Sequence, residues 1–175
     1  MSKIDYDLRK IKAVAFDIDG VLSPSTVPVA ENGTPMRMGN VKDGYAMQLA
    51  VKLGLELAII TGGESKSMEN RMKILGIKNV WQRVADKKIV LLEWMNSLSL
   101  TSEEVAYVGD DIPDLKCLRH VGLSCCPYDA AWEVKQEVLY ISPIRGGYGV
   151  ARDILEQILK ARNQWDTDSK LHYLW

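Results

Sequence analysis

The amino-acid sequence predicts an α/β fold in which helices cover both faces of a doubly wound parallel sheet. Apolar segments of strand length alternate about six times with amphipathic segments of helix length. Such alternation requires crossover connections, which are typical of parallel strands. The apolar segments lack a polar face, and this indicates strands that are buried on both sides.

Length and composition fit one globular domain. The 175 residues are enough for a well-buried core, and a hydrophobic content of 47% is ordinary for such a protein. The net charge of −1 gives no reason to expect a nucleic-acid partner. The three cysteines, Cys117, Cys125 and Cys126, lack the spacing of a disulfide framework or a zinc site. They indicate a reducing compartment, so we expect a cytoplasmic protein.

Domain organisation is expected to be simple. No segment approaches the ~18 apolar residues of a membrane span, so we expect no membrane partner. Without repeats or linkers, residues 1–163 are expected to form a single domain. Residues 164–175 form a polar tail with scattered aromatic side chains, which is either disordered or docked on a neighbouring subunit.

The first elements lead from a strand through a flap to a helix and a second strand. Lys12–Asp17 is an apolar segment that ends in an acidic residue. Residues 24–42 contain two short arms around Asn32-Gly33, a strong hairpin signal, and predict a small β-hairpin flap. Apolar residues at helical spacing predict a helix over Asp43–Leu53, and Leu55–Ile60 is expected to be a buried strand.

The remaining elements continue the alternation. A helix is expected over Glu64–Leu75 and a short strand over Asn79–Gln82. Thr101–Glu104 fits a capping box on a short turn. The other expected elements are the helices Asp86–Leu98, Ile112–His120, Asp129–Glu137 and Tyr148–Ala161 and the strands Val105–Val108, Gly122–Cys125 and Val138–Ile141.

Polar residues follow the predicted strands at the points where they end. Asp17 and Asp19 follow the first strand, Thr61 the second, and Asp110 the strand that ends at Val108. In open parallel sheets, ligands bind beyond the C-terminal ends of the strands. We therefore expect these side chains to converge, together with Lys87, on one rim of the sheet.

The pair Asp17 and Asp19 predicts a cation site. Side chains two residues apart on an extended segment point the same way, so their carboxylates repel each other unless a cation lies between them. Oxygen ligands favour a hard cation, and a site with few carboxylates favours Mg²⁺ over Ca²⁺. Asp110 would complete this cluster.

The same residues suit the hydrolysis of phosphate monoesters, which requires a rate factor of up to ~10²¹. One aspartate can attack phosphorus and form an aspartyl phosphate. The other can protonate the leaving oxygen and then activate water. A threonine hydroxyl and a lysine ammonium group can hold the phosphoryl oxygens. We therefore predict a phosphatase.

The motifs that carry these residues resemble the four motifs of the haloacid dehalogenase-like phosphatases. The sequence has DIDGV at 17–21, Thr-Gly at 61–62, Lys87 and GDDxxD at 109–114, in the order and spacing of that family. The resemblance spans roughly residues 12–160 and implies a Rossmann-like fold.

This resemblance also implies the roles of the acidic residues. Asp17 would be the nucleophile and Asp19 the general acid and base. Magnesium would bind to Asp17, to the backbone carbonyl of Asp19 and to Asp110. Asp111 and Asp114 would support the metal ligands, although Asp111 equally fits a helix N-cap.

The gaps between the motifs leave no room for a cap domain. A capless subgroup with a flap includes the 3-deoxy-D-manno-octulosonate 8-phosphate (KDO 8-phosphate) phosphatases. This chain is similar to them in VKDGYAMQLAVKLGLELAIITG, NRMKILGIKNV, AYVGDDIPDLKCLRHVGLS and IRGGYGVARDILEQILKA. The resemblance implies the hydrolysis of KDO 8-phosphate in lipopolysaccharide precursor biosynthesis. It also implies a homotetramer in which neighbouring subunits help to close each site.

Several residues are candidates for substrate binding by this resemblance. Thr61, Gly62 and Lys87 would hold the phosphoryl group. Arg71 would either pair with the substrate carboxylate or be a solvated helix residue. The other candidates are Lys42 and Asp43, which would belong to the closing surface, and the loop Arg145-Gly146-Gly147, which would approach a ligand closely.

Gly63 is a departure from the family pattern. Many members carry arginine at this position, and relatives that act on nine-carbon sugar acids can carry glutamate. A phosphatase for a nine-carbon keto-sugar acid phosphate, or for another small sugar phosphate, is therefore an alternative.

Functions of other classes fit less well. A dehalogenase needs no leaving-group acid at Asp19, and a phosphosugar mutase normally needs a cap. A receiver-like signalling domain, which is not an enzyme, has its acidic residues in a different order along the chain. A scaffold that has lost activity is disfavoured by the complete set of motifs.

Overall fold

The structure, a computed structural model, describes residues 4–165. Its centre is a six-stranded sheet in the order β3-β2-β1-β4-β5-β6, in which all neighbouring strands are parallel. The strands are β1 Ala13–Phe16, β2 Glu56–Ile60, β3 Asn79–Trp81, β4 Val105–Val108, β5 Leu123–Cys126 and β6 Tyr140–Ile141. The predicted fold class is therefore confirmed. All but the first two residues of the expected tail, 164–175, lie outside the described residues.

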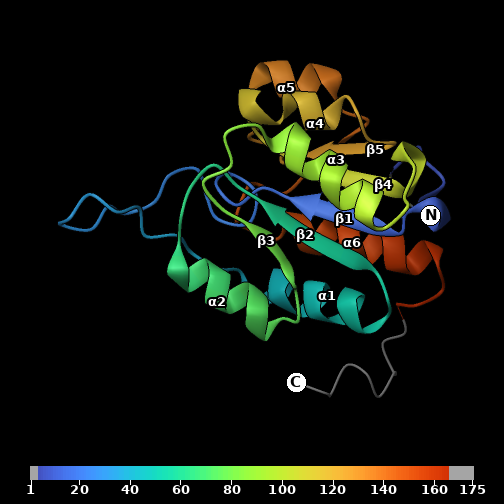
Figure 1. The fold of residues 1–175 in the computed structure, drawn as a ribbon, viewed down its shortest axis with the longest axis horizontal. Coiled ribbons are helices and arrows are strands. Elements are labelled where there is room, and N and C mark those ends of the chain that lie inside the picture. Colours follow the sequence, from blue (N-terminus) through green and yellow to red (C-terminus); the bar gives the residue numbers. More distant parts are fainter. Residues whose placement is uncertain (1–3, 166–175) are drawn as a thin grey trace.

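Helices cover both faces of this sheet (Figure 1). One face carries α1 Val41–Lys52, α2 Lys66–Ile74 and α6 Val150–Ala161, and the other carries α3 Lys87–Ser97, α4 Leu115–Leu118 and α5 Trp132–Glu137. Side chains of β1 alternate between the two cores: Val14 and Phe16 pack on the first face, and Ala13 and Ala15 on the second. Three short 3₁₀ helices complete the elements of this part of the chain: η1 Leu8–Lys10, η2 Ser102–Glu104 and η3 Ile112–Asp114.

Helix boundaries differ from the predictions by a few residues, and capping side chains explain where α2 and α3 begin. The helix predicted from Glu64 begins at Lys66 because the Ser65 hydroxyl caps it and accepts a hydrogen bond from the Met68 backbone N–H at 3.3 Å. Asp86 caps α3 rather than belonging to it. The helix predicted over Ile112–His120 is divided into η3 and α4.

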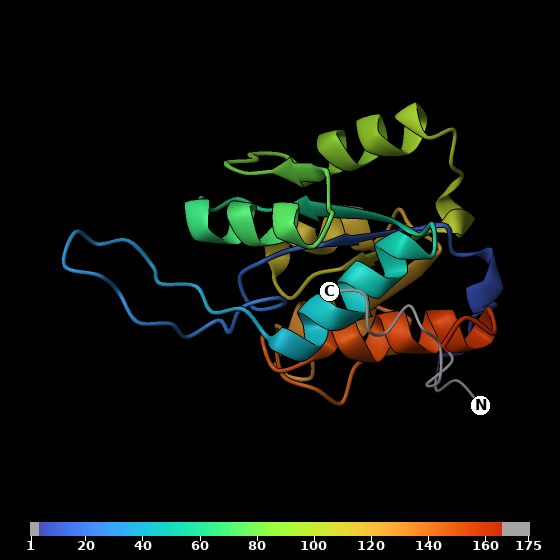
Figure 2. The same ribbon diagram turned by 90° about the horizontal axis from the view of Figure 1, so that it is seen from below.

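The flap projects from the body of the protein as a long, narrow loop (Figure 2). It contains an antiparallel bridge between Val29 and Pro35, and the Ala30 N–H donates to the Thr34 carbonyl at 2.9 Å. Gly33 has a φ of +82°, whereas Asn32 is not in the positive-φ region. The predicted hairpin is thus closed by a turn with a single left-handed glycine, which is typical of a three-residue loop rather than the tighter Asn-Gly turn.

Candidate active site

The ends of β1, β2 and β4 meet at one edge of the sheet. Phe16, the last residue of β1, lies opposite Ile59 of β2 and Val108 of β4, so the residues that follow these strands begin side by side. A cavity of about 460 Å³ opens at this edge, and we refer to it as the strand-end cavity. The predicted residues that line it are Asp17, Asp19, Thr61, Gly62, Lys87, Asp110, Asp111 and Asp114.

Asp17 lies at the floor of the strand-end cavity and is 6% exposed. Its Oδ1 accepts a hydrogen bond from the Ile18 N–H at 2.7 Å, and its Oδ2 lies 2.8 Å from Nζ of Lys87. Burial, followed by repulsion from Asp114, raises the pKa of Asp17 to about 6, although Lys87 opposes this shift. One carboxylate oxygen is thus held by the backbone and the other by an ammonium group.

Lys87 joins two buried carboxylates. It is the first residue of α3, and its Nζ lies 2.8 Å from both Asp17 Oδ2 and Asp114 Oδ1. Burial opposes the charge on Lys87, but the attraction of the two carboxylates outweighs it and raises the pKa of the lysine. Lys87 therefore carries a positive charge beside Asp17 at neutral pH.

Asp114 is fully buried, and both its carboxylate oxygens accept hydrogen bonds from protein groups. Its Oδ1 also accepts from the Tyr107 hydroxyl at 2.8 Å, and its Oδ2 accepts from the backbone N–H groups of Asp110 at 3.1 Å and Asp111 at 3.4 Å. Asp114 thus orders the loop after β4 and positions Lys87. Sequence reasoning missed Tyr107, because within an apolar strand its hydroxyl has no visible partner.

The carboxylate cluster fits a divalent cation. Asp17, Asp110 and Asp114 each offer an oxygen within 4.8 Å of the others. Burial and the neighbouring carboxylates Asp114, Asp17 and Asp111 raise the pKa of Asp110 to about 8, and no hydrogen bond from residues 4–165 stabilises its carboxylate. Because hard oxygen donors favour Mg²⁺, a bound cation would offset the repulsion that these carboxylates experience.

A glycine provides the space for Asp110. A Cβ atom on Gly20 would lie 1.8 Å from Asp110 Oδ2, and Gly20 has a φ of +79°. The glycine of the DIDG segment therefore allows the carboxylate to reach the residues that follow β1. A side chain at this position would push Asp110 out of the cluster.

Thr61 and Asp111 occupy the rim of the strand-end cavity. Thr61 is buried, and its Oγ1 accepts from the Gly63 N–H at 3.2 Å, which shapes the turn after β2. Asp111 is exposed and caps η3 by accepting from the Ile112 N–H at 2.8 Å. For Asp111, the structure thus contains the N-cap interaction that the sequence left as an alternative.

Asp19 is held by a residue of the flap that the sequence did not suggest. Arg37 donates from Nε to Asp19 Oδ1 at 2.7 Å and from Nη2 to Oδ2 at 2.8 Å. This bidentate pair offsets the charge of Asp19, whose carboxylate is not part of the cluster formed by Asp17, Asp110 and Asp114. No spacing rule relates a flap arginine to Asp19, because their contact depends on where the flap folds back.

Three predicted substrate residues lie outside the strand-end cavity of this chain. Arg71 lies beside α1, where a Cβ on Gly44 would come within 2.5 Å of its Nη2, and together with Asp43 it lines a separate small hollow. Lys42 is exposed at the start of α1. Asp43 is buried, accepts from the Arg152 N–H at 2.6 Å and has its pKa raised to about 6 by burial.

The loop at Arg145-Gly146-Gly147 packs on the chain itself. A Cβ on Gly146 would lie 1.9 Å from the Gly20 carbonyl oxygen, and the Gly147 N–H donates to the Val21 carbonyl at 2.8 Å. The close approach expected of these glycines is therefore made to the backbone after β1. The loop braces the segment that carries Asp17 and Asp19.

The chain is similar to known proteins both in a family model and in sequence. The model of the haloacid dehalogenase-like hydrolases matches residues 45–127. The 3-deoxy-D-manno-octulosonate 8-phosphate phosphatase of Escherichia coli strain K12 is 35% identical over 158 residues, which cover 90% of this chain and 84% of that protein. The Yersinia pestis enzyme is 33% identical over 154 residues, covering 88% and 82% of the two chains. Within residues 4–165, no helix is long and apolar enough to cross a membrane.

Solved structures are similar over the same length. A 3-deoxy-D-manno-octulosonate 8-phosphate phosphatase from Yersinia pestis superposes with a TM-score of 0.86 at 32% identity, covering 90% of this chain and 85% of that one. The enzyme of that name from Moraxella catarrhalis, in complex with a magnesium ion, a phosphate ion and KDO, gives a TM-score of 0.87 at 35% identity, covering 91% and 92%.

Proposed function

Because the chain belongs to the 3-deoxy-D-manno-octulosonate 8-phosphate phosphatases of the haloacid dehalogenase-like family, we propose that it releases phosphate from KDO 8-phosphate. The observation that carries the proposal is the buried contact of Lys87 with Asp17, next to carboxylates that fit a divalent cation. The reaction would be magnesium-dependent and would belong to lipopolysaccharide precursor biosynthesis. The similar Moraxella catarrhalis enzyme binds magnesium, phosphate and KDO, which supports this substrate.

The first chemical step would be carried out by Asp17 and Asp19. A carboxylate oxygen of Asp17 attacks phosphorus, the bond from phosphorus to the sugar oxygen breaks, and Asp19 gives its proton to that oxygen. Lys87 and Thr61 stabilise the charge on the phosphoryl oxygens, aided by the backbone of Gly62. The sugar acid leaves with its oxygen protonated.

The second step regenerates the enzyme. Asp19, now ionised, takes a proton from water, whose oxygen attacks the phosphorus of the aspartyl phosphate and releases Asp17 and inorganic phosphate. Magnesium would be held by Asp17, the Asp19 carbonyl and Asp110, where it would neutralise the carboxylates and the phosphate dianion. Asp114 positions Lys87 throughout, and Asp111 supports the same loop.

We further propose that a neighbouring subunit completes the site. The strand-end cavity is open to solvent, while phosphoryl transfer benefits from exclusion of water. The flap exposes Val29, Met36 and Met38, which offer apolar area for a second copy of the chain. In a homotetramer, Lys42 would belong to this closing surface and Arg71 would pair with the substrate carboxylate, whereas Asp43 is buried and its place on this surface is not supported. We also propose that residues 1–163 form one domain, with the flap at 24–42, and that the protein is cytoplasmic.

A phosphate-release screen tests the substrate. It would compare KDO 8-phosphate with a nine-carbon keto-sugar acid phosphate and with an aldose phosphate, each with and without magnesium. We expect the highest kcat/KM for KDO 8-phosphate. A higher value for the nine-carbon acid would transfer the assignment to that substrate, and absence of turnover of all three would contradict the proposed function.

A further inference from the structure

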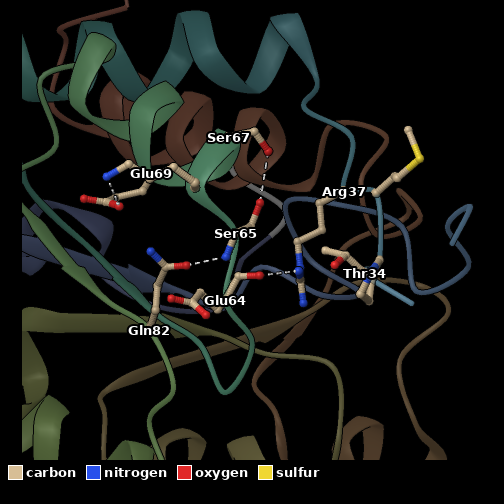
Figure 3. Close-up of a pocket in the computed structure, with 10 residues that line it drawn as sticks. Thr34, Arg37, Glu64, Ser65, Ser67, Glu69 and Gln82 are labelled. Carbon is tan, nitrogen blue, oxygen red and sulfur yellow. Dashed lines mark hydrogen bonds and ion pairs between the residues drawn. The ribbon is translucent and has the colours of Figure 1, made fainter. Parts of the chain in front are cut away.

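A second cavity lies between the flap and the beginning of α2 (Figure 3). This flap cavity has a volume of about 520 Å³. Its polar lining includes Thr34, Arg37, Glu64, Ser65, Ser67 and Gln82. Arg37 connects the two cavities, because it lines the flap cavity and contacts Asp19 of the strand-end cavity.

Arg37 is half-buried although most of the flap around it is exposed. Its side chain is 6% exposed, whereas the flanking Met36 and Met38 are 55% and 47% exposed. Besides its two hydrogen bonds to Asp19, its Nη1 donates to the Glu64 carbonyl at 2.8 Å. A guanidinium has five N–H groups, so one on Nη1 and one on Nη2 have no partner among residues 4–165.

Gly63 provides the space that the guanidinium occupies. A Cβ on Gly63 would lie 2.3 Å from Arg37 Nη2 and 3.0 Å from Asp19 Oδ2. The backbone of Gly63 is not in the positive-φ region, so its conformation tolerates other residues. Arg37 therefore needs a residue without a side chain at position 63, whereas the backbone conformation does not require a glycine.

Arg37 lies where the leaving sugar of the substrate must pass. In the proposed function, Asp19 protonates the oxygen that joins phosphorus to the sugar, so that oxygen lies within hydrogen-bond reach of Asp19. Arg37 contacts Asp19 at 2.7 Å and 2.8 Å. The sugar carbons next to the phosphoester must therefore pass beside the guanidinium, and their hydroxyl oxygens can accept from its two remaining N–H groups.

We propose that Arg37 is a substrate-binding residue that recognises hydroxyl oxygens on the carbons next to the phosphoester, and that Gly63 is the residue that admits it. This inference rests on the proposed function and assigns to the flap a role in specificity within its own subunit. The flap cavity would then hold the part of the sugar beyond these carbons.

The first test compares two substrates in Arg37→Ala. One is KDO 8-phosphate, and the other is phenyl phosphate, whose leaving group has no hydroxyl beside the phosphoester. We expect kcat/KM to fall about 10- to 100-fold more for the sugar acid phosphate than for phenyl phosphate, because only the sugar loses a hydrogen bond to a charged group, whereas loss of the contact with Asp19 affects both substrates. Arg37→Lys should restore part of the loss. An equal loss for both substrates, or no loss for either, would overturn the proposal.

The matched control is Arg119→Ala. Arg119 makes a similar bidentate contact, from Nε and Nη2 to the Glu137 carboxylate at 3.1 Å and 2.7 Å, but at an exposed position outside both cavities. Its removal should leave the ratio of the two kcat/KM values unchanged. If Arg119→Ala changed that ratio as much as Arg37→Ala does, the effect would be due to general loss of an ion pair and the proposal would be overturned.

The second test is a double-mutant cycle with Gly63→Ala. The new methyl group must displace the flexible end of Arg37, so the single variant should fold and reproduce the selective loss of Arg37→Ala. The double variant should be no worse than either single one, since both remove the same contact. Additive losses would show that Gly63 acts independently of Arg37 and would contradict the pairing.

Failure of the proposed function and failure of this inference give different experimental results. If the wild-type protein does not hydrolyse KDO 8-phosphate, the proposed function fails, and the comparison is repeated with the hydroxylated phosphate monoester that it hydrolyses fastest. Retention of the selective loss with that substrate would support Arg37 as a hydroxyl-binding residue. A uniform loss would overturn the inference as well.

Discussion

Burial of the Asp43 carboxylate is expected to make the stability of the folded protein depend on pH. Asp43 is 3% exposed, and its Oδ1 accepts from the Arg152 N–H at 2.6 Å. Its Oδ2 has no hydrogen-bond partner among residues 4–165. Burial therefore raises the pKa of Asp43 from 3.8 to about 6, against the smaller effect of Arg152. An asparagine has almost the same shape, can keep the bond to Arg152 and carries no charge.

The sign and size of the effect follow from the raised pKa. Protonated Asp43 is favoured by folding, so its contribution to stability is fully present below about pH 4 and is lost as pH rises through about 6. A shift of about 2 pKa units at 1.36 kcal/mol each gives about 3 kcal/mol. For a chain of this length, that corresponds to about 6–12 °C in melting temperature. Asp43→Asn should therefore be more stable than wild type at pH 8, with the difference vanishing near pH 4.

Thermal unfolding followed by circular dichroism at closely spaced pH values between 4 and 8 measures this difference. Asp7→Asn serves as the control, because hydrogen bonding to Arg9 lowers the pKa of the exposed Asp7, so that folding favours its ionised form. Asp7→Asn should therefore not become more stable relative to wild type as the pH rises. A difference between Asp43→Asn and wild type that is the same at pH 4 and pH 8 would refute the reasoning.

Further predictions concern the active site. Asp114→Ala should lower the free energy of unfolding by about 3–5 kcal/mol, because it removes one of the two buried carboxylates beside Lys87 and leaves the Tyr107 hydroxyl and two backbone N–H groups without their acceptor. Asp111→Ala, which removes only an exposed cap, should cost about 0.5–2 kcal/mol, and equal losses in urea titrations of the two variants would contradict this ranking. Lys87→Met should reduce kcat at least about 100-fold with the fold retained, and a near-normal kcat would remove Lys87 from the mechanism. Chelation should abolish phosphate release and added Mg²⁺ should restore it, whereas activity that persists after exhaustive chelation would exclude a metal requirement.

The strand-end residues were predictable because the rule that locates them is general. The apolar segments that lead to Asp17, Thr61 and Asp110 end at the same edge of a parallel sheet, and the structure brings these residues to one cavity. The helices were predictable for a related reason, since their apolar stripes have a fixed period. Their first residues were not, because Ser65 and Asp86 act as caps, which a periodic pattern does not distinguish from helical residues.

The surroundings of the site depend on tertiary placement, which local patterns do not determine. Arg71 was expected near the substrate, but its side of α2 faces α1 and Gly44. Arg37 was not predicted, since the contact with Asp19 requires the flap to fold back across Gly63. Gly63 departs from the family pattern, and only the position of Arg37 gives this departure a physical reason.

The stereochemical course at phosphorus tests the central claim most directly. A substrate whose phosphoryl group is chiral through oxygen isotopes reports the number of in-line displacements. If Asp17 takes the phosphoryl group and passes it to another acceptor, two displacements occur and the configuration is retained. Transfer to an acceptor alcohol by the wild-type protein should therefore show retention, with Asp17→Asn inactive. Inversion would mean that the acceptor attacks directly and that Asp17 is not the nucleophile.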